Sequence, residues 1–414
     1  MTEPLRVVVD NSAGLTAPPP ACPRRARTLF IDFVATDSSY ELRIQGSAMP
    51  EDGSERWLGR VQVPRAAVDD WVAYLHEQWD GSVIRRRRDG GYPYAEHVNL
   101  LARTATADRE AVWRSLARAG HDLFKLLFHG QDDELKWIGD RLADALRADH
   151  QVICVHSDEV VVPWAMLYVP PDPADDLSGD APVDRSGFWG LRHVIEHCFN
   201  GPARSAPHTR YAVRPLAGSF VDPELATRRG HNVAEPALRM LRAHTDLRQN
   251  ASSRELEDEL RGPARRYHVM YFSCHCVPDG NGSAKLRLPG AAVSTTNFDI
   301  WLRGSGLTAN PLVFITACRS AGLEASPHHF SRTLLNQGAN CLVGPYVNIP
   351  TAFARSFAAR LLGQVLGHRA TVGEAVHAVA VHFAERFDNP LGLTFSVYHG
   401  TDSHLCPEGP DVTG

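Results

Sequence analysis

The sequence predicts an α/β fold with a parallel or mostly parallel sheet that helices cover on both faces. From residue 151 onward, short apolar strands alternate with segments that have helical spacing of their apolar residues. Strands such as "PLVFITAC" (311–318) are apolar throughout, which is typical of a strand buried on both faces. With 414 residues, the chain is long enough for two domains or for one large domain with an added module.

The N-terminal part is expected to be organised separately. Clustered prolines predict an irregular lead-in over residues 1–27, because proline cannot donate to a helix or sheet ladder. Residues 28–105 contain a hairpin pattern, "TLFIDFVA" and "YELRIQG", followed by the helical pattern "VPRAAVDDWVAYLHEQW". These patterns predict a small α+β module, whose role the sequence does not indicate.

Residues 106–414 are expected to form the main domain, with its functional part at about 205–400. Two amphipathic helices open it, "REAVWRSLARAGHDLFKLLF" and "DELKWIGDRLADALR". The strands "YHVMYFSCH", "PLVFITAC" and "ANCLVGPY" then alternate with the helices "NFDIWLRG" and "HFSRTLLNQG". Ser252 with Glu255, and Thr371 with Glu374, fit capping boxes that start two further helices, and "LTFSVYHG" is the last strand.

Composition and charge argue against several classes of protein. With 43 basic and 48 acidic residues, the net charge of −5 gives no overall attraction to nucleic acid or to an anionic membrane. No stretch reaches the roughly 18 apolar residues of a membrane span, and the first residues do not resemble a secretory signal, so we expect a cytoplasmic protein. The eight cysteines are sparse and irregularly spaced, which predicts free thiols. Arginine greatly outnumbers lysine, which favours a bacterial source with a GC-rich genome.

Two strand ends carry the residue types that nucleophilic catalysis requires. Functional groups collect beyond the carboxyl ends of parallel strands, and His275 and Cys318 each end an apolar strand. Cys341 begins its strand and is expected at the opposite edge. A thiol beside an imidazole base is the minimum set for acyl transfer. Because buried free cysteines are also common as simple packing, the pattern alone leaves catalysis and core packing equally open.

The segment "SCHC" raises the question of a metal site, because Cys274, His275 and Cys276 are all zinc-ligand types. Side chains alternate along a strand, so the two cysteines would point to one face and the histidine to the other. One ion could not easily bind all three. We therefore predict no metal and no cofactor, and keep zinc binding by Cys274 and Cys276 only as a weak alternative.

The chain also resembles a known family. The segment "TACRS" shares Ala-Cys-Arg with the caspase signature. Over a longer span it is similar to the CHAT family, caspase-like domains related to separase, in which a strand ending in His-Gly precedes a strand ending in Ser-Ala-Cys. The corresponding pieces here are "YFSCHC" and "ITACRSAG". The resemblance covers roughly residues 110–400, including "VVVPWAMLYVP", "NQGANCLVGPYVNIP" and "LTFSVYHG", and it implies a caspase-like fold and a cysteine peptidase.

The resemblance also implies roles for individual residues. It places the catalytic histidine at His275 and the nucleophile at Cys318, with the backbone N–H groups of Cys276 and Cys318 as oxyanion donors. The family usually has glycine where this chain has Cys276, at a place where close approach or a positive φ can be required. The candidates for an acidic pocket that binds a basic substrate side chain are Asp279, Asp299 and Glu324, and an apolar pocket is equally open.

The function implied by the resemblance is that of a cysteine endopeptidase that cleaves a partner protein and is activated by a signal. Family members are linked to bacterial immunity, including antiviral defence, and to programmed cell death. We therefore expect a protein substrate encoded nearby, with a gasdermin-type pore-former as one candidate, and an activating sensor partner. The alternative is a catalytically inactive caspase-like scaffold that binds a partner protein, with residues 28–105 as its adaptor.

Overall fold

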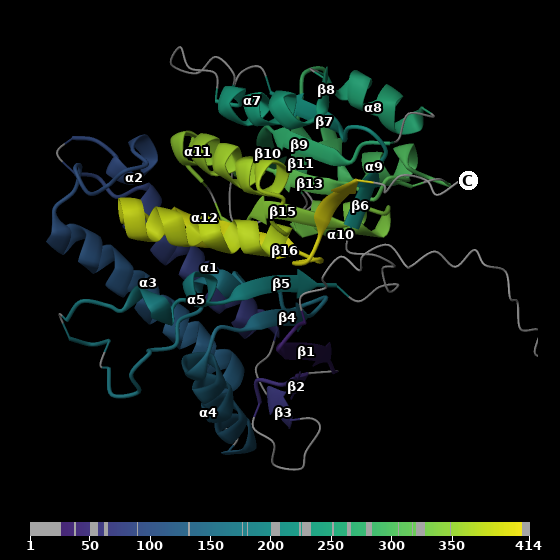
Figure 1. The fold of residues 1–414 in the computed structure, drawn as a ribbon. Helices are drawn as coiled ribbons and strands as arrows, with labels where there is room; N and C mark the ends of the chain where they lie inside the picture. Colours follow the sequence, from purple (N-terminus) through teal and green to yellow (C-terminus); the bar gives the residue numbers. More distant parts are fainter. Residues whose placement is uncertain are drawn as a thin grey trace, which may run out of the picture.

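The fold of the chain is known from a computed structural model (Figure 1). The structure describes residues 26–407, apart from 37–38, 50–56, 62–64, 89, 131–132, 176, 180, 200–207, 223–224, 226–232, 251, 263–265, 279–283, 305, 317, 320–327 and 348. Nearly all of the expected lead-in at 1–27 lies outside the described residues. The helices and strands below refer to the described part of the chain.

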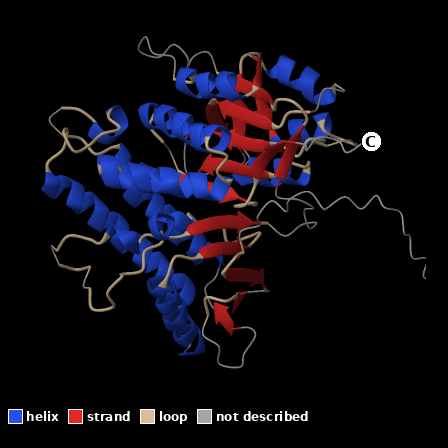
Figure 2. Ribbon diagram, viewed as in Figure 1, coloured by secondary structure: helices blue, strands red, loops and turns tan. Residues whose placement is uncertain are grey.

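One eleven-stranded sheet runs through the molecule (Figure 2). In spatial order its strands are β3 (Trp57–Val61), β2 (Tyr40–Gln45), β1 (Leu29–Ala35), β4 (Val152–His156), β5 (Val194–Cys198), β16 (Phe395–Tyr398), β15 (Cys341–Pro345), β13 (Leu312–Ile315), β9 (Val269–Ser273), β7 (Leu216–Val221) and β8 (Asp246–Asn250). Neighbouring strands are mostly parallel, and the exceptions are the pairs β3–β2, β2–β1 and β16–β15. The predicted α/β class with a mostly parallel sheet is confirmed.

Apart from the antiparallel strands β2 and β3 at one end, the direction of the strands reverses once inside this sheet. Strands β1, β4, β5 and β16 are parallel to one another, and so are β15, β13, β9, β7 and β8. The two groups meet at the antiparallel pair of β16 and β15. The carboxyl ends of β4 and β5 therefore lie at the edge of the sheet opposite to the carboxyl ends of β9 and β13.

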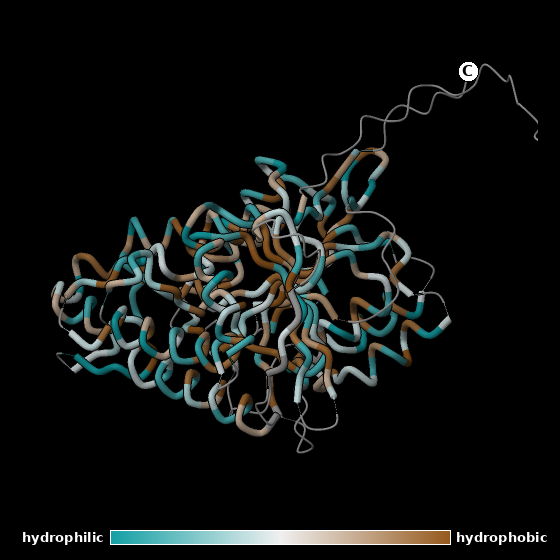
Figure 3. The backbone as a smooth tube through the Cα atoms, turned by 90° about the horizontal axis from the view of Figure 1, so that it is seen from below, coloured by the Kyte–Doolittle hydropathy of each residue, from teal (hydrophilic) through white to brown (hydrophobic). Residues whose placement is uncertain are grey.

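Helices pack on both faces of the sheet, as the continuous apolar strands predict. Along β13, Leu312 and Phe314 belong to one buried apolar cluster, whereas Val313 and Ile315 belong to a second one. Because side chains alternate along a strand, each cluster covers one face. Apolar strands accordingly occupy the middle of the molecule in Figure 3.

The first cluster includes side chains of α3 (Thr106–Phe128), α4 (Asp133–Ala148), α7 (Glu235–His244), α11 (Thr351–Leu362) and α12 (Val372–Phe387). The second includes side chains of α8 (Ser253–Arg261), α9 (Thr295–Trp301) and α10 (His328–Asn336). The described helices α1 (Arg65–Trp79), α2 (Pro93–Glu96) and α5 (Trp189–Arg192) also contribute side chains to the first cluster. No described helix has the length and apolar character needed to cross a bilayer.

The N-terminal strands extend the main sheet. Strand β1 pairs in parallel with β4, with Leu29 beside Ile153 and Asp32 beside His156. The sheet is thus continuous across residue 105. The domain boundary that the sequence predicts at this residue stays a prediction. The capping box of Ser252 and Glu255 is present at the start of α8.

Candidate active site

The candidate active site lies beyond the carboxyl ends of β9 and β13, which run side by side in the same direction. Past these ends the chain forms a second sheet of four strands. In spatial order these are β12 (Ala292–Ser294), β11 (Ala284–Arg287), β10 (His275–Pro278) and β14 (Cys318–Arg319). His275 begins β10 and Cys318 begins β14. The expectation that each residue ends a long strand is therefore wrong, because β9 and β13 end shortly before these residues.

The second sheet brings the two residues together. Strands β10 and β14 are parallel, with His275 as the register partner of Cys318 and Cys276 as the partner of Arg319. Neighbouring strands lie roughly 4.8 Å apart, so the backbones at His275 and Cys318 are adjacent. Cys341 lies at the start of β15, beside Leu312 at the start of β13, and thus at the opposite edge as expected.

Hydrogen bonds join the two segments just before the pair. The backbone N–H of Thr316 donates to the carbonyl oxygen of Phe272 at 2.8 Å, and its hydroxyl donates to the same oxygen at 3.2 Å. The Thr316 hydroxyl also lies 3.2 Å from the hydroxyl of Tyr271. Thr316 and His275 are both buried. The approach to Cys318 is therefore fixed to β9, the strand that leads to His275.

Cys276 has an ordinary extended backbone. It lies in β10 as the register partner of Leu286, and the non-glycine residues with positive φ in the described chain are Asn310, Arg369, Asp388 and His399. An extended residue needs none of the conformational freedom of glycine. The cysteine that replaces the usual glycine of the family therefore introduces no backbone strain at this position.

The side chains of Cys274 and Cys276 belong to the apolar core. Both are fully buried, in the cluster that also contains Phe220 and Leu286. Among the described residues, the cysteines that group with a histidine in metal-ligand geometry are instead Cys154 and Cys198, with His156. The spacing of these three residues in the sequence matches no metal-binding motif, so sequence analysis missed them.

The structure describes only one of the three acidic residues that were expected to line a substrate pocket. Asp279 and Glu324 lie outside the described residues. Asp299 is exposed on α9, where its carboxylate accepts a hydrogen bond from the side-chain amide of Gln337 at 3.2 Å. Whether any of the three lines a substrate pocket stays a prediction.

Asp222 is an acidic residue near the pair that sequence analysis missed. It directly follows β7, is only 3% exposed, and its backbone N–H donates to the carbonyl oxygen of Ser273 at 2.9 Å. Its carboxylate lies 3.9 Å from the guanidinium of Arg287. The strand-end rule that identified His275 and Cys318 would also have found Asp222.

These features define an α/β protein with a mostly parallel sheet, in which a cysteine and a histidine are adjacent beyond the carboxyl ends of two strands. Residues 200–386, which contain His275 and Cys318, match the model of the CHAT domain. The resemblance noted in the sequence is thereby confirmed.

Similar solved structures belong to separase. Two crystal structures of the Saccharomyces cerevisiae separase–securin complex, at 2.6 and 3.0 Å resolution, have TM-scores of 0.46 and 0.45 and 10% sequence identity to this chain. Each match covers 92% of this chain and 30% of the separase chain, so the chain spans less than a third of the protein it matches. No curated protein matches the sequence.

Proposed function

We propose that the chain is a cysteine endopeptidase with Cys318 as its nucleophile and His275 as its base. The observation that supports this most strongly is the register pairing of the two residues within the segment that matches the CHAT domain. A thiol and an imidazole on adjacent backbones need only short side-chain movements to exchange a proton. A buried histidine beside the carboxyl edge of a parallel sheet also fits the usual position of catalytic groups in this kind of fold.

The reaction proposed is ordinary acyl transfer. His275 accepts the thiol proton of Cys318, and the sulfur attacks the carbonyl carbon of the scissile peptide bond. The backbone N–H groups of Cys276 and Cys318 stabilise the oxyanion that forms. The His275 imidazolium then protonates the departing amine as the C–N bond breaks. Water, deprotonated by His275, attacks the thioester and releases the acid product, which restores the thiol.

Asp222 is proposed to bind the side chain before the cleaved bond. Its carboxylate is buried, follows a strand beside β9, and lies 3.9 Å from the guanidinium of the half-exposed Arg287. A substrate arginine or lysine could approach this carboxylate more closely and form charge-assisted hydrogen bonds with it. We therefore infer a preference for a basic residue at that position.

The proposed biological setting is that of the family the sequence resembles. We infer a cytoplasmic bacterial protease that acts in antiviral defence or programmed cell death and is activated by a sensor partner. Its substrate would be a protein encoded nearby, with a gasdermin-type pore-former as the first candidate. Support for this setting comes only from the CHAT resemblance.

The inactive scaffold is the alternative function, and its main support was Cys276. The extended backbone at Cys276 removes that support, because no conformation restricted to glycine is required there. We therefore favour the peptidase.

Incubation of the purified chain with proteins encoded by neighbouring genes tests the proposal. The expected result is a defined pair of fragments, whose sequenced ends give the cleavage site. Cys318→Ala and His275→Ala should each abolish cleavage, whereas Cys406→Ala, which alters a partly exposed cysteine in β17 (His404–Pro407), should not. Cleavage that persists in both variants would disprove the assignment of the pair.

A further inference from the structure

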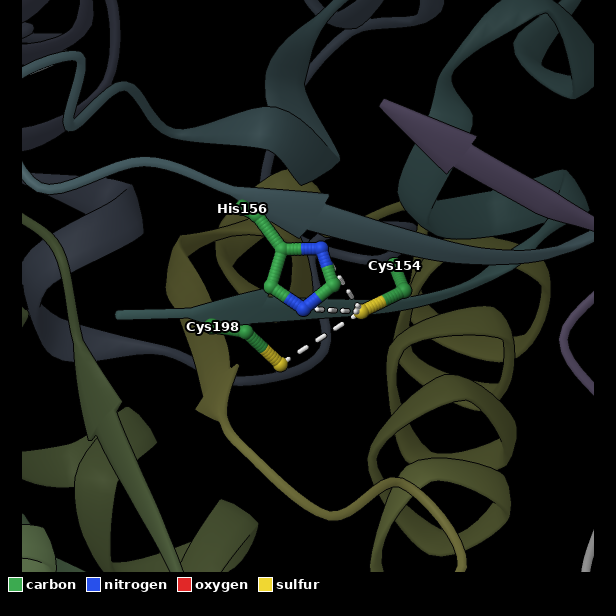
Figure 4. Close-up of side chains that lie close together, drawn as sticks. All are labelled: Cys154, His156 and Cys198. Atoms are coloured by element: carbon green, nitrogen blue, oxygen red, sulfur yellow. Dashed lines mark hydrogen bonds between the residues drawn. The ribbon is translucent and has the colours of Figure 1, made fainter. Parts of the chain in front are cut away.

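A second group of reactive side chains lies where β4 and β5 end (Figure 4). His156 and Cys198 are register partners on these two parallel strands, and Cys154 lies two residues before His156 on β4. The Cys154 sulfur is 3.4 Å from the Cys198 sulfur and 3.7 Å from the Nε2 atom of His156. One ligand atom from each residue lies within 4.8 Å of the others.

These separations are close to those of ligands around one tetrahedral zinc ion. Zinc–sulfur bonds of about 2.3 Å and zinc–nitrogen bonds of about 2.0 Å place neighbouring sulfurs about 3.8 Å apart, and a sulfur and a nitrogen about 3.5 Å apart. The observed 3.4 Å and 3.7 Å differ from these values by a few tenths of an ångström. Only small side-chain shifts would centre an ion among Cys154, His156 and Cys198.

The histidine is held in an orientation suited to metal binding. Its Nδ1 atom is 2.9 Å from a carboxylate oxygen of Asp32 on β1, so Nε2, which lies 3.7 Å from the Cys154 sulfur, is the nitrogen left to bind a metal. A carboxylate on the far nitrogen is the usual companion of a zinc-binding histidine, because it fixes the ring and makes the ligand nitrogen more basic. The ring of Phe30 also stacks on His156. Asp32 thus holds the His156 ring in position.

Burial and access also fit a metal site. Cys154 and Cys198 are each only 3% exposed, whereas the side chain of His156 is 36% exposed, so one side of the group is open to solvent. The Cys198 side chain also makes a hydrogen bond with the side chain of His399.

His399 is placed to supply a fourth ligand. It directly follows β16, the strand beside β5, where Tyr398 is the register partner of His197. The backbone N–H of His399 donates to the carbonyl oxygen of His197 at 2.9 Å, which brings His399 level with Cys198. His399 also has a positive φ of 60°, an uncommon conformation for this residue type and one often found at functional sites.

A disulfide fits the two cysteines poorly. Cys154 pairs with Glu196, two residues before Cys198, so the two cysteines are diagonal neighbours on adjacent strands. Their Cα atoms would be about 8 Å apart, given the rise along a strand and the spacing between strands. Disulfides require Cα separations below roughly 7 Å.

We propose that Cys154, His156, Cys198 and His399 bind one zinc ion, with Asp32 orienting His156. The ion links the ends of β4, β5 and β16, and through Asp32 it reaches β1. It lies at the sheet edge opposite to His275 and Cys318, so its role is structural and separate from peptide cleavage. The zinc site and the peptidase can therefore be tested independently.

Metal analysis of the full chain tests the proposal first. We expect close to one zinc per chain after purification, or after incubation with one equivalent of zinc followed by desalting. Replacement with cobalt should give the intense visible bands of a tetrahedral site and a sulfur-to-cobalt charge-transfer band. A chain that retains no zinc and gives no such bands would overturn the proposal, as would a Cys154–Cys198 disulfide found by mass spectrometry under reducing purification.

Variants then assign the ligands. Cys198→Ala should lose the zinc, while Cys274→Ala, which alters a buried cysteine beyond the end of β9 at the opposite edge of the sheet, should retain it. Asp32→Asn should fold normally and weaken zinc binding roughly 10- to 100-fold, measured by competition with a chromogenic chelator. His399→Gln should shift the cobalt spectrum.

Unchanged zinc affinity in both Asp32→Asn and Cys198→Ala would contradict the assignment of the ligands. If Cys198→Ala does not fold, unchanged zinc affinity in Asp32→Asn alone would contradict it.

Discussion

His275 of β10 lies directly beside Cys318 of β14, although α9 and the strands β11, β12 and β13 separate the two residues in the sequence. The pairing follows from two parallel strands, β9 and β13, that end at the same edge and continue into the small second sheet. The position of the candidate nucleophile thus depends on the whole strand–helix–strand unit.

The first prediction concerns the reactivity of Cys318. An electrophilic peptide probe should label Cys318 faster than any other cysteine at pH 7, because an adjacent imidazole increases the thiolate fraction. His275→Ala should slow the labelling by about 100-fold or more. Peptide mapping by mass spectrometry gives the rates, with Cys406 as the internal reference. Labelling of Cys406 at the same rate as Cys318 in the unaltered chain would contradict the prediction.

The second prediction concerns Asp222 and rests on the proposed function. Asp222→Asn should lower kcat/KM for substrates with arginine or lysine before the cleaved bond by roughly 30-fold or more, because a buried charge partner is lost. Substrates with an apolar residue there should change little. Asp246→Asn is the matched control, because Asp246 is exposed at the start of β8, at the other edge of the sheet, and it should change kcat/KM less than twofold. Equal losses for basic and apolar substrates would exclude Asp222 as the specificity residue.

The third prediction concerns the buried ion pair between Asp388 and Arg109, which joins the end of α12 to α3. Asp388 also accepts a hydrogen bond from the indole N–H of Trp113 at 2.7 Å. Asp388→Asn retains the shape and tolerates the φ of 54°, but it leaves Arg109 buried without its charge partner. The free energy of unfolding should fall by about 3–5 kcal/mol in urea titrations.

A control for this prediction is Asp144→Asn. Asp144 is exposed and pairs with Arg147 at 3.2 Å, so its loss should cost less than about 1 kcal/mol. Similar costs for the Asp388 and Asp144 variants would show that burial does not strengthen the Asp388 ion pair.

The fourth prediction concerns pH and the buried His193. Burial, together with the nearby Arg192, His150 and His377, lowers the pKa of His193 to about 3. Its Nδ1 atom also accepts a hydrogen bond from the backbone N–H of Gln151 at 3.1 Å. In the unfolded chain its pKa is about 6.5, so the unfolded state binds more protons below that pH. Its contribution to stability is complete above pH 6.5 and is lost as the pH falls toward 3.

His193→Asn provides the test, because its side-chain oxygen can accept the same hydrogen bond without titrating. Between pH 7.5 and 4.5, the unaltered chain should lose about 2–3 kcal/mol more of its free energy of unfolding than the variant, at 1.36 kcal/mol for each pH unit below 6.5. Urea titrations at several pH values give both curves. Parallel curves would contradict the assigned pKa shift.

The sequence predicted the central strands and helices well, for a local reason. Segments such as "PLVFITAC" are apolar throughout because both faces of the strand are covered, and this property is visible in the sequence itself. The capping box of Ser252 and Glu255 is equally local. The same information placed His275 and Cys318 at one edge.

Features that depend on the register between distant strands were not predicted. Nothing in "TLFIDFVA" indicates that β1 pairs with β4, because that contact joins segments far apart in the chain. The grouping of Cys154 and His156 with Cys198 depends on the register of β4 against β5. The short breaks before His275 and Cys318 were missed because neither "YFSCH" nor "FITAC" contains a glycine or proline that would mark a break.

The antiparallel contact of β15 and β16 has a consequence for how the protein can be altered. Residues beyond the carboxyl ends of β4 and β5 and those beyond β9 and β13 belong to opposite rims of one sheet. Loops on one rim can lengthen or change sequence without entering the other. Affinity tags, reporter groups or inhibitory binders can therefore be attached at the β4–β5 rim while the rim that holds His275 stays accessible to substrate.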